Sequence, residues 1–377
     1  MKRNSICLCR NNFMKKIIFI SPPFLHSKGK NIKVESDVYN HFVTGLKNSY
    51  HKFDIVKFIT SEDQKIILDL NHLKDLILKD KNSLILIDGN SSPGDDTGIY
   101  PIELINVLKK SQLDVICFVP DLIKEVSMNK WIEYSKFIIA TTKTGVAWAN
   151  DYYKTKKFVY YPTWPVTKFG SNDMEDFISR PFDFGYVGSN KIFRINLISS
   201  ILKIGGNKFS SIVISSYRSG SILNTTEKYL EVLSNCKFFL CTRAALKESY
   251  EKENLKIKIT EGRYANRISE AIACGCIPLY FQPDVKNIIK YYINYFLYFS
   301  KISKMFNLNN VSGSKTSEPY DEIGIKGGFI VIDNPIKAIN IIKSKDVDFF
   351  KRIKEDSQKI YNEYIDPNKF FDFILNK

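Results

Sequence analysis

The stretch that decides the fold is Arg267–Phe281, which reads RISEAIACGCIPLYF. Its first part has the composition of a helix, and Gly275 stands where a helix ends in a left-handed residue, a conformation that glycine adopts at little cost. An apolar run follows from Ile277, with Pro278 near its start, where a strand tolerates proline. The stretch therefore predicts a helix, a tight turn and a buried strand.

Arg267 and Glu270 are three residues apart, so they share one face of the predicted helix. In an open parallel sheet, ligands bind in the crevice at the carboxyl edge. A carboxylate there can accept hydrogen bonds from ribose hydroxyls, and a guanidinium can hold a diphosphate in bidentate fashion. We therefore expect both residues to contact a nucleotide, and the turn at Gly275 to line a cleft between two lobes.

Strand-like and helix-like segments alternate on both sides of this stretch, which predicts βαβ units and mostly parallel sheets. The first series spans residues 14–165, and the alternation lapses over 166–181, which we interpret as a linker. A second series spans 182–345, and a helical, aromatic-rich segment spans 346–377. Residues 1–13 are expected to be a disordered extension. The predicted class is α/β, with two Rossmann-like domains.

Arg267–Phe281 resembles the signature of the exostosin family, glycosyltransferase family 47, which has the form Arg-x-x-Glu-Ala…Gly-Cys-Ile-Pro. The segment Tyr229–Arg243 is similar to the segment that precedes this signature, and the first half of the chain has no match. The resemblance implies the GT-B architecture, in which the last helix packs back on the first of two Rossmann-like domains. It also implies sugar transfer from a nucleotide donor, with inversion. A charged insertion over Arg243–Lys258 departs from the family and leaves the donor open.

The expected donor site consists of basic residues near the signature and a strand-to-helix turn at Gly188. Backbone N–H groups at the start of a helix bind phosphate well, and the charge of a departing diphosphate must be neutralised. A plain turn capped by Ser189 is the alternative for the turn, and a helix-surface ion pair is the alternative for Arg267 and Glu270. The predicted donor-site residues are Gly188, Ser189, Arg194, Arg218, Arg243, Lys258, Arg263, Arg267 and Glu270.

A catalytic base is expected from the first domain, since a carboxylate or histidine must take the proton of the acceptor hydroxyl. Asp88 ends a predicted strand before a glycine-containing loop, and Asp95, Asp96 and His26 lie in loops at the same predicted edge. Asp95 and Asp96 are adjacent, so they do not form an Asp-x-Asp metal motif. The cysteines and histidines show no zinc-ligand spacing. We therefore expect no metal and no cofactor apart from the donor.

Composition narrows the class of protein. The seven cysteines form no CxxC pair, which favours reduced, buried thiols. No apolar run approaches the roughly 18 residues of a membrane span, and no cleavage pattern follows the apolar run at Ile17, which predicts a cytoplasmic protein. The net charge of +15 is typical either of attraction to anions, including the inner face of a membrane, or of a lysine-rich background. No nucleic-acid-binding module is present.

The sequence thus predicts a glycosyltransferase that moves a sugar from a nucleotide-sugar donor to a glycan or lipid-linked acceptor in surface polysaccharide biosynthesis. A fucosyltransferase-like enzyme that uses a GDP-sugar is one alternative. A non-catalytic two-domain sugar-binding protein is the other. Peripheral contact with the membrane stays open.

Overall fold

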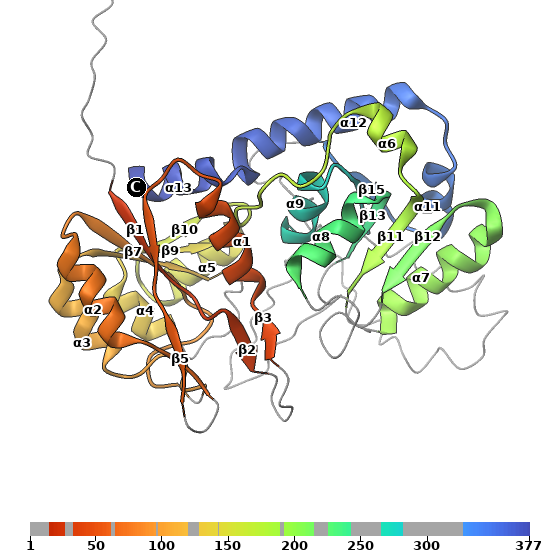
Figure 1. Cartoon of the computed structure of the whole chain (residues 1–377). Helices are drawn as coiled ribbons and strands as arrows, with labels where there is room; N and C mark the ends of the chain where they lie inside the picture. Colours follow the sequence, from red (N-terminus) through yellow and green to blue (C-terminus); the bar gives the residue numbers. More distant parts are fainter. Residues whose placement is uncertain are drawn as a thin grey trace, which may run out of the picture.

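The structure, a computed structural model, describes residues 15–26, 33–61, 65–95, 97–119, 128–141, 143–188, 192–214, 225–242, 265–281 and 327–377. Two lobes, each built on one sheet, lie side by side, and the C-terminal helices run across both (Figure 1).

The first domain is built on a sheet of six described strands, all parallel, in the order β10-β9-β8-β7-β1-β4. These strands are β1 (Lys16–Ile20), β4 (Phe53–Ile55), β7 (Ser83–Asp88), β8 (Asp114–Phe118), β9 (Phe137–Ala140) and β10 (Phe158–Tyr160). Two antiparallel hairpins lie outside this sheet, namely β2 (Phe24–His26) with β3 (Lys33–Glu35), and β5 (Phe58–Thr60) with β6 (Ile66–Leu68).

Helices cover both faces of this sheet. They are α1 (Asp37–Lys47), α2 (Leu70–Lys79), α3 (Leu104–Ser111), α4 (Met128–Tyr134) and α5 (Lys143–Tyr152). α1 begins at Ser36, whose side chain accepts the Tyr39 N–H, and Asp37 in its first turn complements the positive end of the helix dipole.

The second domain is built on five described parallel strands in the order β12-β11-β13-β14-β15. The strands are β11 (Phe182–Val187), β12 (Ser211–Ile214), β13 (Cys236–Thr242), β14 (Ile277–Phe281) and β15 (Ile330–Ile332). The helices of this half of the chain are α6 (Met174–Ser179), α7 (Ile192–Gly205) with a 3₁₀ turn (Gly206–Lys208), α8 (Thr226–Ser234), α9 (Ala265–Ala273), α11 (Pro335–Ile342) and α12 (Val347–Ile360) with a π-helical turn (Tyr361–Ile365). α13 (Pro367–Asn376) follows and packs on the first domain.

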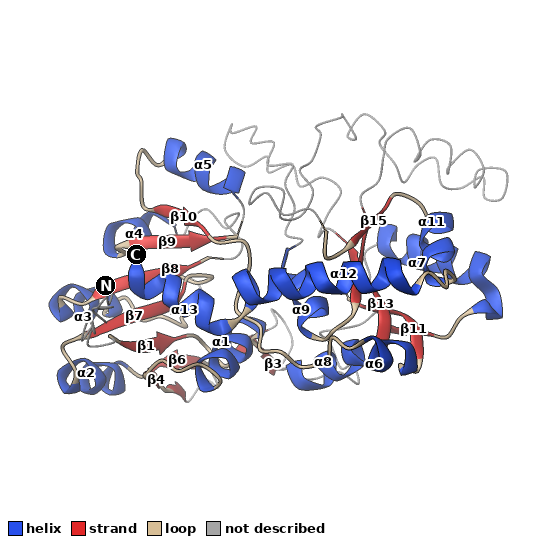
Figure 2. Ribbon diagram, turned by 90° about the horizontal axis from the view of Figure 1, so that it is seen from above, coloured by secondary structure: helices blue, strands red, loops and turns tan. Residues whose placement is uncertain are grey.

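The predicted α/β class with two Rossmann-like domains is confirmed by these sheets. α6 lies inside residues 166–181, so the predicted linker is partly helical. α12 runs along the second domain toward the first, and α13 lies beside α1 (Figure 2). The predicted return of the last helix to the first domain is therefore confirmed as well, and the arrangement is that of GT-B.

β1 is buried on both faces, as a central strand of a parallel sheet requires. Ile18 and Ile20 belong to a core on one face of the first sheet. Ile17 and Phe19 belong to a core on the other face, and this second core continues without a break into the second domain.

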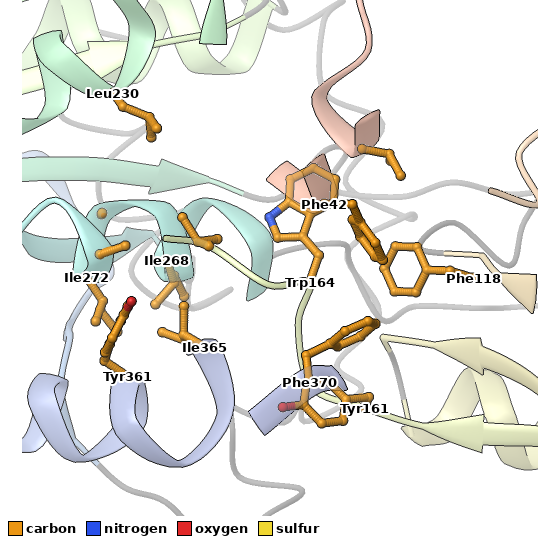
Figure 3. Packing of buried hydrophobic residues seen from close by; sticks show 14 of the residues in the cluster. Phe42, Phe118, Tyr161, Trp164, Leu230, Ile268, Ile272, Tyr361, Ile365 and Phe370 are labelled. Carbon is orange, nitrogen blue, oxygen red and sulfur yellow. The ribbon is translucent and has the colours of Figure 1, made fainter. Parts of the chain in front are cut away.

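The continuous core joins the two domains around Trp164, which follows β10. Phe42 and Phe118 pack on the first-domain side, with ring centroids 4.9 Å apart, and Ile268 of α9 lies on the other side (Figure 3). Phe370 of α13 meets Phe42 edge-to-face at 5.2 Å. Because this interface is apolar and continuous, we expect the domains to be held more firmly than by a flexible linker alone.

Gly275 adopts the predicted left-handed conformation, with φ of 70°, and Pro278 is the second residue of β14, as expected. The prediction that this turn lines a cleft is wrong. α9 ends at the amino edge of the sheet, where Phe169 and Gly170 of the linker donate their N–H groups to Ala273 O at 2.9 and 3.1 Å. The linker therefore covers the turn on the side away from the carboxyl edge.

A buried cation also holds this turn. Lys354 of α12 is 3% exposed and donates from Nζ to Gly275 O at 2.8 Å. Its ammonium lies 5.0 Å from the centroid of the Phe177 ring. The carbonyls at the end of α9 carry partial negative charge, which a lysine at this position offsets.

Candidate functional site

Helices that begin at the carboxyl edge of one sheet touch helices that begin at the carboxyl edge of the other. Asn40, in the first turn of α1, donates from Nδ2 to Thr226 Oγ1 at 2.9 Å. The N–H of Thr226, the first residue of α8, donates to Glu35 Oε2 at 3.3 Å. Ligands of open parallel sheets bind at this edge, so these contacts mark one wall of the crevice between the domains.

Glu270, in the middle of α9, is the centre of a hydrogen-bonded group drawn from both domains, and its side chain is nearly inaccessible. His41 Nε2 of α1 lies 3.1 Å from Glu270 Oε1. Tyr229 Oη donates to Glu270 Oε2 at 2.6 Å, and Arg267 Nη1 donates to the same oxygen at 3.0 Å. We call His41, Tyr229, Arg267 and Glu270 the interdomain cluster. The predicted ribose contact of Glu270 stays a prediction, and in this arrangement three side chains already engage the carboxylate.

The interdomain cluster keeps Glu270 ionised. Burial alone would raise the pKa of this carboxyl, but the charge of Arg267 and the hydrogen bond and charge of His41 outweigh burial and the repulsion from Asp37. The pKa of Glu270 therefore lies below its ordinary value of 4.5. A buried carboxylate that stays charged needs partners of this kind.

Arg267 connects the interdomain cluster to the carboxyl end of β11. Its guanidinium lies over the Tyr229 ring, 4.7 Å from the centroid, and its charge also acts on Tyr186, the next-to-last residue of β11. Arg194 donates a hydrogen bond to the Tyr186 hydroxyl. Burial raises the pKa of Tyr186, and the two arginines oppose that rise. Both arginines thus act on one tyrosine at the carboxyl end of β11, Arg194 through a hydrogen bond and Arg267 through its charge.

The two arginines suit an anionic ligand. Arg194 is the third residue of α7 and Arg267 the third residue of α9, so both lie at helix ends where the dipole favours negative charge. Guanidinium groups bind phosphate oxygens in bidentate fashion. The side chain of Arg267 is 28% exposed, so it is within reach of a ligand while it holds Glu270.

Gly188 extends the second sheet, since its N–H donates to Ile214 O at 3.0 Å. A role of this turn in phosphate binding stays a prediction. A Cβ at this position would come within 2.5 Å of the Tyr186 hydroxyl oxygen. The missing side chain therefore makes room for the Tyr186 hydroxyl, which accepts a hydrogen bond from Arg194.

Asp88 lies at the carboxyl end of β7, as predicted, but its carboxylate is buried and hydrogen-bonded. Ser21 Oγ donates to Oδ2 at 3.1 Å, and the N–H and Nδ2 of Asn90 donate to Oδ1 at 3.1 and 2.8 Å. Tyr100 Oη donates to the backbone carbonyl of Asp88 at 2.9 Å. These contacts fit a carboxylate that fixes the turns after β1 and β7, and the role of Asp88 as a base stays a prediction.

Asp95 organises its own loop, since its carboxylate accepts the N–H groups of Ser92 and Thr97 at 2.7 and 3.0 Å and the hydroxyl of Thr97. His26 ends β2, where its backbone pairs with Lys33. The remaining predicted site residues lie outside the described part of the chain: Asp96, Ser189, Arg218, Arg243, Lys258 and Arg263.

His41 and Tyr229 are site residues that sequence reasoning missed. A local signal for His41 existed, because Asp37 and His41 are four apart at the start of a helix and so share one face. No such signal existed for its partner, since Glu270 is 229 positions away.

Within the described ranges, no three histidine, cysteine, aspartate or glutamate side chains are grouped so that they could hold a metal ion. Among the helices of these ranges, none combines the length and the apolar character that a bilayer span requires.

No family model and no curated protein matches the sequence. Among solved structures, MurG of Acinetobacter baumannii is similar over 96% of this chain and 100% of its own, with a TM-score of 0.39 and 8% identity. S. aureus TarM, in complex with fondaparinux, alpha-GlcNAc-glycerol and UDP, is similar over 84% of this chain and 60% of its own (TM-score 0.41, 8% identity). Apo UGT2 of Phytolacca americana is similar over 96% of this chain and 99% of its own (TM-score 0.38, 10% identity). Likenesses at this level identify no family, so the exostosin resemblance stays a prediction.

Proposed function

We propose that this chain is a glycosyltransferase that binds the diphosphate of a nucleotide-sugar donor at the carboxyl edge of its second domain. The observation that carries this proposal is the pair Arg194 and Arg267, each in the first turn of its helix, whose charges both act on Tyr186 at the carboxyl end of β11. Sugar transfer from such a donor releases a negatively charged group, and fixed cations that face it lower the barrier to its departure.

The proposed reaction is a direct displacement. The acceptor oxygen bonds to the anomeric carbon while the bond from that carbon to the diphosphate oxygen breaks, which inverts the configuration. The electron pair leaves with the diphosphate, whose charge Arg194 and Arg267 offset. The proton of the acceptor hydroxyl goes to a base of the first domain.

Among the predicted candidates we propose His26 as the base from the position of its backbone alone, while Asp96 lies outside the described residues. Asp88 and Asp95 have their carboxylates engaged in their own loops. The β2–β3 hairpin, by contrast, reaches the crevice, because Glu35 on β3 contacts Thr226 of the second domain. Glu35 pairs with Phe24, and His26 follows two residues further along β2. Figure 1 locates this hairpin between the two lobes.

The acceptor class rests on the sequence alone. We propose a glycan or lipid-linked acceptor in surface polysaccharide biosynthesis, as the exostosin resemblance implies, with contact at a membrane face in keeping with the net charge of +15.

A thermal-shift screen over UDP-, GDP-, CMP- and dTDP-sugars tests the donor site. We expect one nucleotide to stabilise the wild type, by about 2.7 kcal/mol at a hundred times its Kd. Arg194→Gln should lose most of this effect. Lys208→Gln, the same change of charge at the amino edge of the sheet, should retain it.

The outcomes separate the alternatives. If no nucleotide stabilises the wild type, or if Arg194→Gln responds as the wild type does, the donor site is refuted. Stabilisation by GDP-sugars alone would favour the fucosyltransferase-like enzyme. Tight binding of a free sugar, without release of a nucleotide from any donor, would favour the non-catalytic sugar-binding protein.

A further inference from the structure

The interdomain cluster links a residue of the first domain to the proposed donor site in the second. His41 contacts Glu270, Glu270 accepts the hydrogen bond of Arg267, and Arg267 acts on Tyr186. His41 itself has no contact with Arg194 or Tyr186 among those described. The described route from His41 to the donor site runs through Glu270 to Arg267.

The side chains that link His41 to Arg267 are held in place by their neighbours. The side chain of His41 is 3% exposed, and its ring packs against Trp164 with centroids 5.1 Å apart. Tyr229 holds the second oxygen of Glu270 and also lies under the Arg267 guanidinium. A shift of the carboxylate would consequently change the orientation of the guanidinium as well as its hydrogen bond.

We propose that His41 is a positioning residue for donor binding. By fixing the carboxylate of Glu270 from the first domain, it orients Arg267 toward the diphosphate, so that donor affinity in the second domain depends on contact with the first. This inference rests on the proposed function, because it needs a diphosphate at Arg267. The domain interface would then contribute to donor binding, because Arg267 is held in its binding orientation only while the two domains are in contact.

A neighbouring contact supplies the matched control. Asn40 lies on the same turn of α1 and also bridges to the second domain, through Thr226, but it does not touch Glu270. Removing either side chain weakens the domain interface. Only the loss of His41 should disturb Arg267.

The test measures the affinity of the full chain for the stabilising nucleoside diphosphate by isothermal titration calorimetry. We expect His41→Ala to weaken binding about tenfold, within the range typical of coupled sites. His41→Gln, which keeps a hydrogen-bond donor near Glu270, should recover most of the affinity. Asn40→Ala should bind as the wild type does, although both alanine variants lower the melting temperature of the free protein.

A double-mutant cycle decides whether the effect passes through Arg267. In an Arg267→Gln background, His41→Ala should cause no further loss of affinity. An equal loss in both backgrounds, or wild-type affinity of His41→Ala, would overturn the inference and leave the proposed function standing. If the wild type binds no nucleoside diphosphate, the proposed function fails and the inference with it. Should His41→Ala not fold, His41→Phe in the same cycle serves as the replacement, since it fills the buried space without a hydrogen bond.

Discussion

Lys354 offers a test of how the second domain is held together. Burial lowers the pKa of this lysine to about 8 from 10.5, with the charge of Arg180 acting in the same direction. The unfolded chain therefore binds a proton over a pH range in which the folded chain has released it. Stability then rises with pH between about 8 and 10.5, because the unfolded state holds more protons there.

The magnitude follows from that difference. A gap of about 2.5 pKa units, at 1.36 kcal/mol per unit, corresponds to about 3 kcal/mol over the whole range, of which about 2 kcal/mol falls between pH 7.5 and 9.5. Lys354→Met removes the titrating group and nearly preserves its volume. It also removes the hydrogen bond to Gly275 O, which costs about 1.5–3 kcal/mol and so offsets the benefit of burying no charge at neutral pH.

We therefore expect the free energy of unfolding of Lys354→Met to be close to that of the wild type at pH 7.5. At pH 9.5 the difference between the two proteins should be larger by about 2 kcal/mol, with the variant the less stable one. Urea unfolding of both proteins under reducing conditions, followed by circular dichroism at the two pH values, measures the difference, in which all other titrating groups cancel. Lys351→Met, at an exposed position of the same helix, is the control and should run parallel to the wild type. A gap between Lys354→Met and the wild type that stays constant within about 0.5 kcal/mol from pH 7.5 to 9.5 would refute the buried-charge reasoning.

Two further predictions concern the turn after α9 and the docking of α13 on the first domain. Gly275→Ala should lower the free energy of unfolding by about 3 kcal/mol or more, since φ is 70° and a Cβ would lie 2.0 Å from Ser171 O. Gly206→Ala is the control, with φ of 58° and open space around it, and should lower the free energy of unfolding by only about 1 kcal/mol. Urea unfolding measures both. Burial lowers the pKa of His51 against the opposing charge of Asp372, so the docking of α13 should weaken as pH falls below 6.5. His51→Gln should remove this dependence, and hydrogen exchange of the α13 amides at pH 5 and 7 measures it; equal exchange protection of the wild type at both values would contradict the prediction.

Much of the fold could be predicted because it depends on local patterns. The alternation of β-branched runs with amphipathic helices specifies parallel sheets, and Gly275 and Pro278 carry their conformational requirements with them. The direction of the turn was misjudged, because a helix that leads into a parallel strand ends at the amino edge and not at the crevice. Local spacing does not show which edge a given turn occupies.

The candidate site was only partly predictable, because its contacts are distant in sequence. Arg194 and Arg267 were expected on chemical grounds, but the effect of both charges on Tyr186 depends on the tertiary arrangement of α7, α9 and β11. Glu270 was assigned to a ribose, whereas a partner 229 positions away now accounts for one of its oxygens. Asp88 was placed at the correct strand end, and only the fold reveals that Ser21 and Asn90 occupy its carboxylate.

The return of α13 to the first domain has a consequence for how the chain acquires its shape. Phe370 and Phe371 complete the core over Phe42, yet the ribosome makes them after the whole second domain. We therefore expect the first lobe to complete its core over Phe42 only after the second domain has been made, although an N-terminal domain usually finishes folding first. Until α13 is synthesised, part of the apolar surface around Phe42 should stay uncovered.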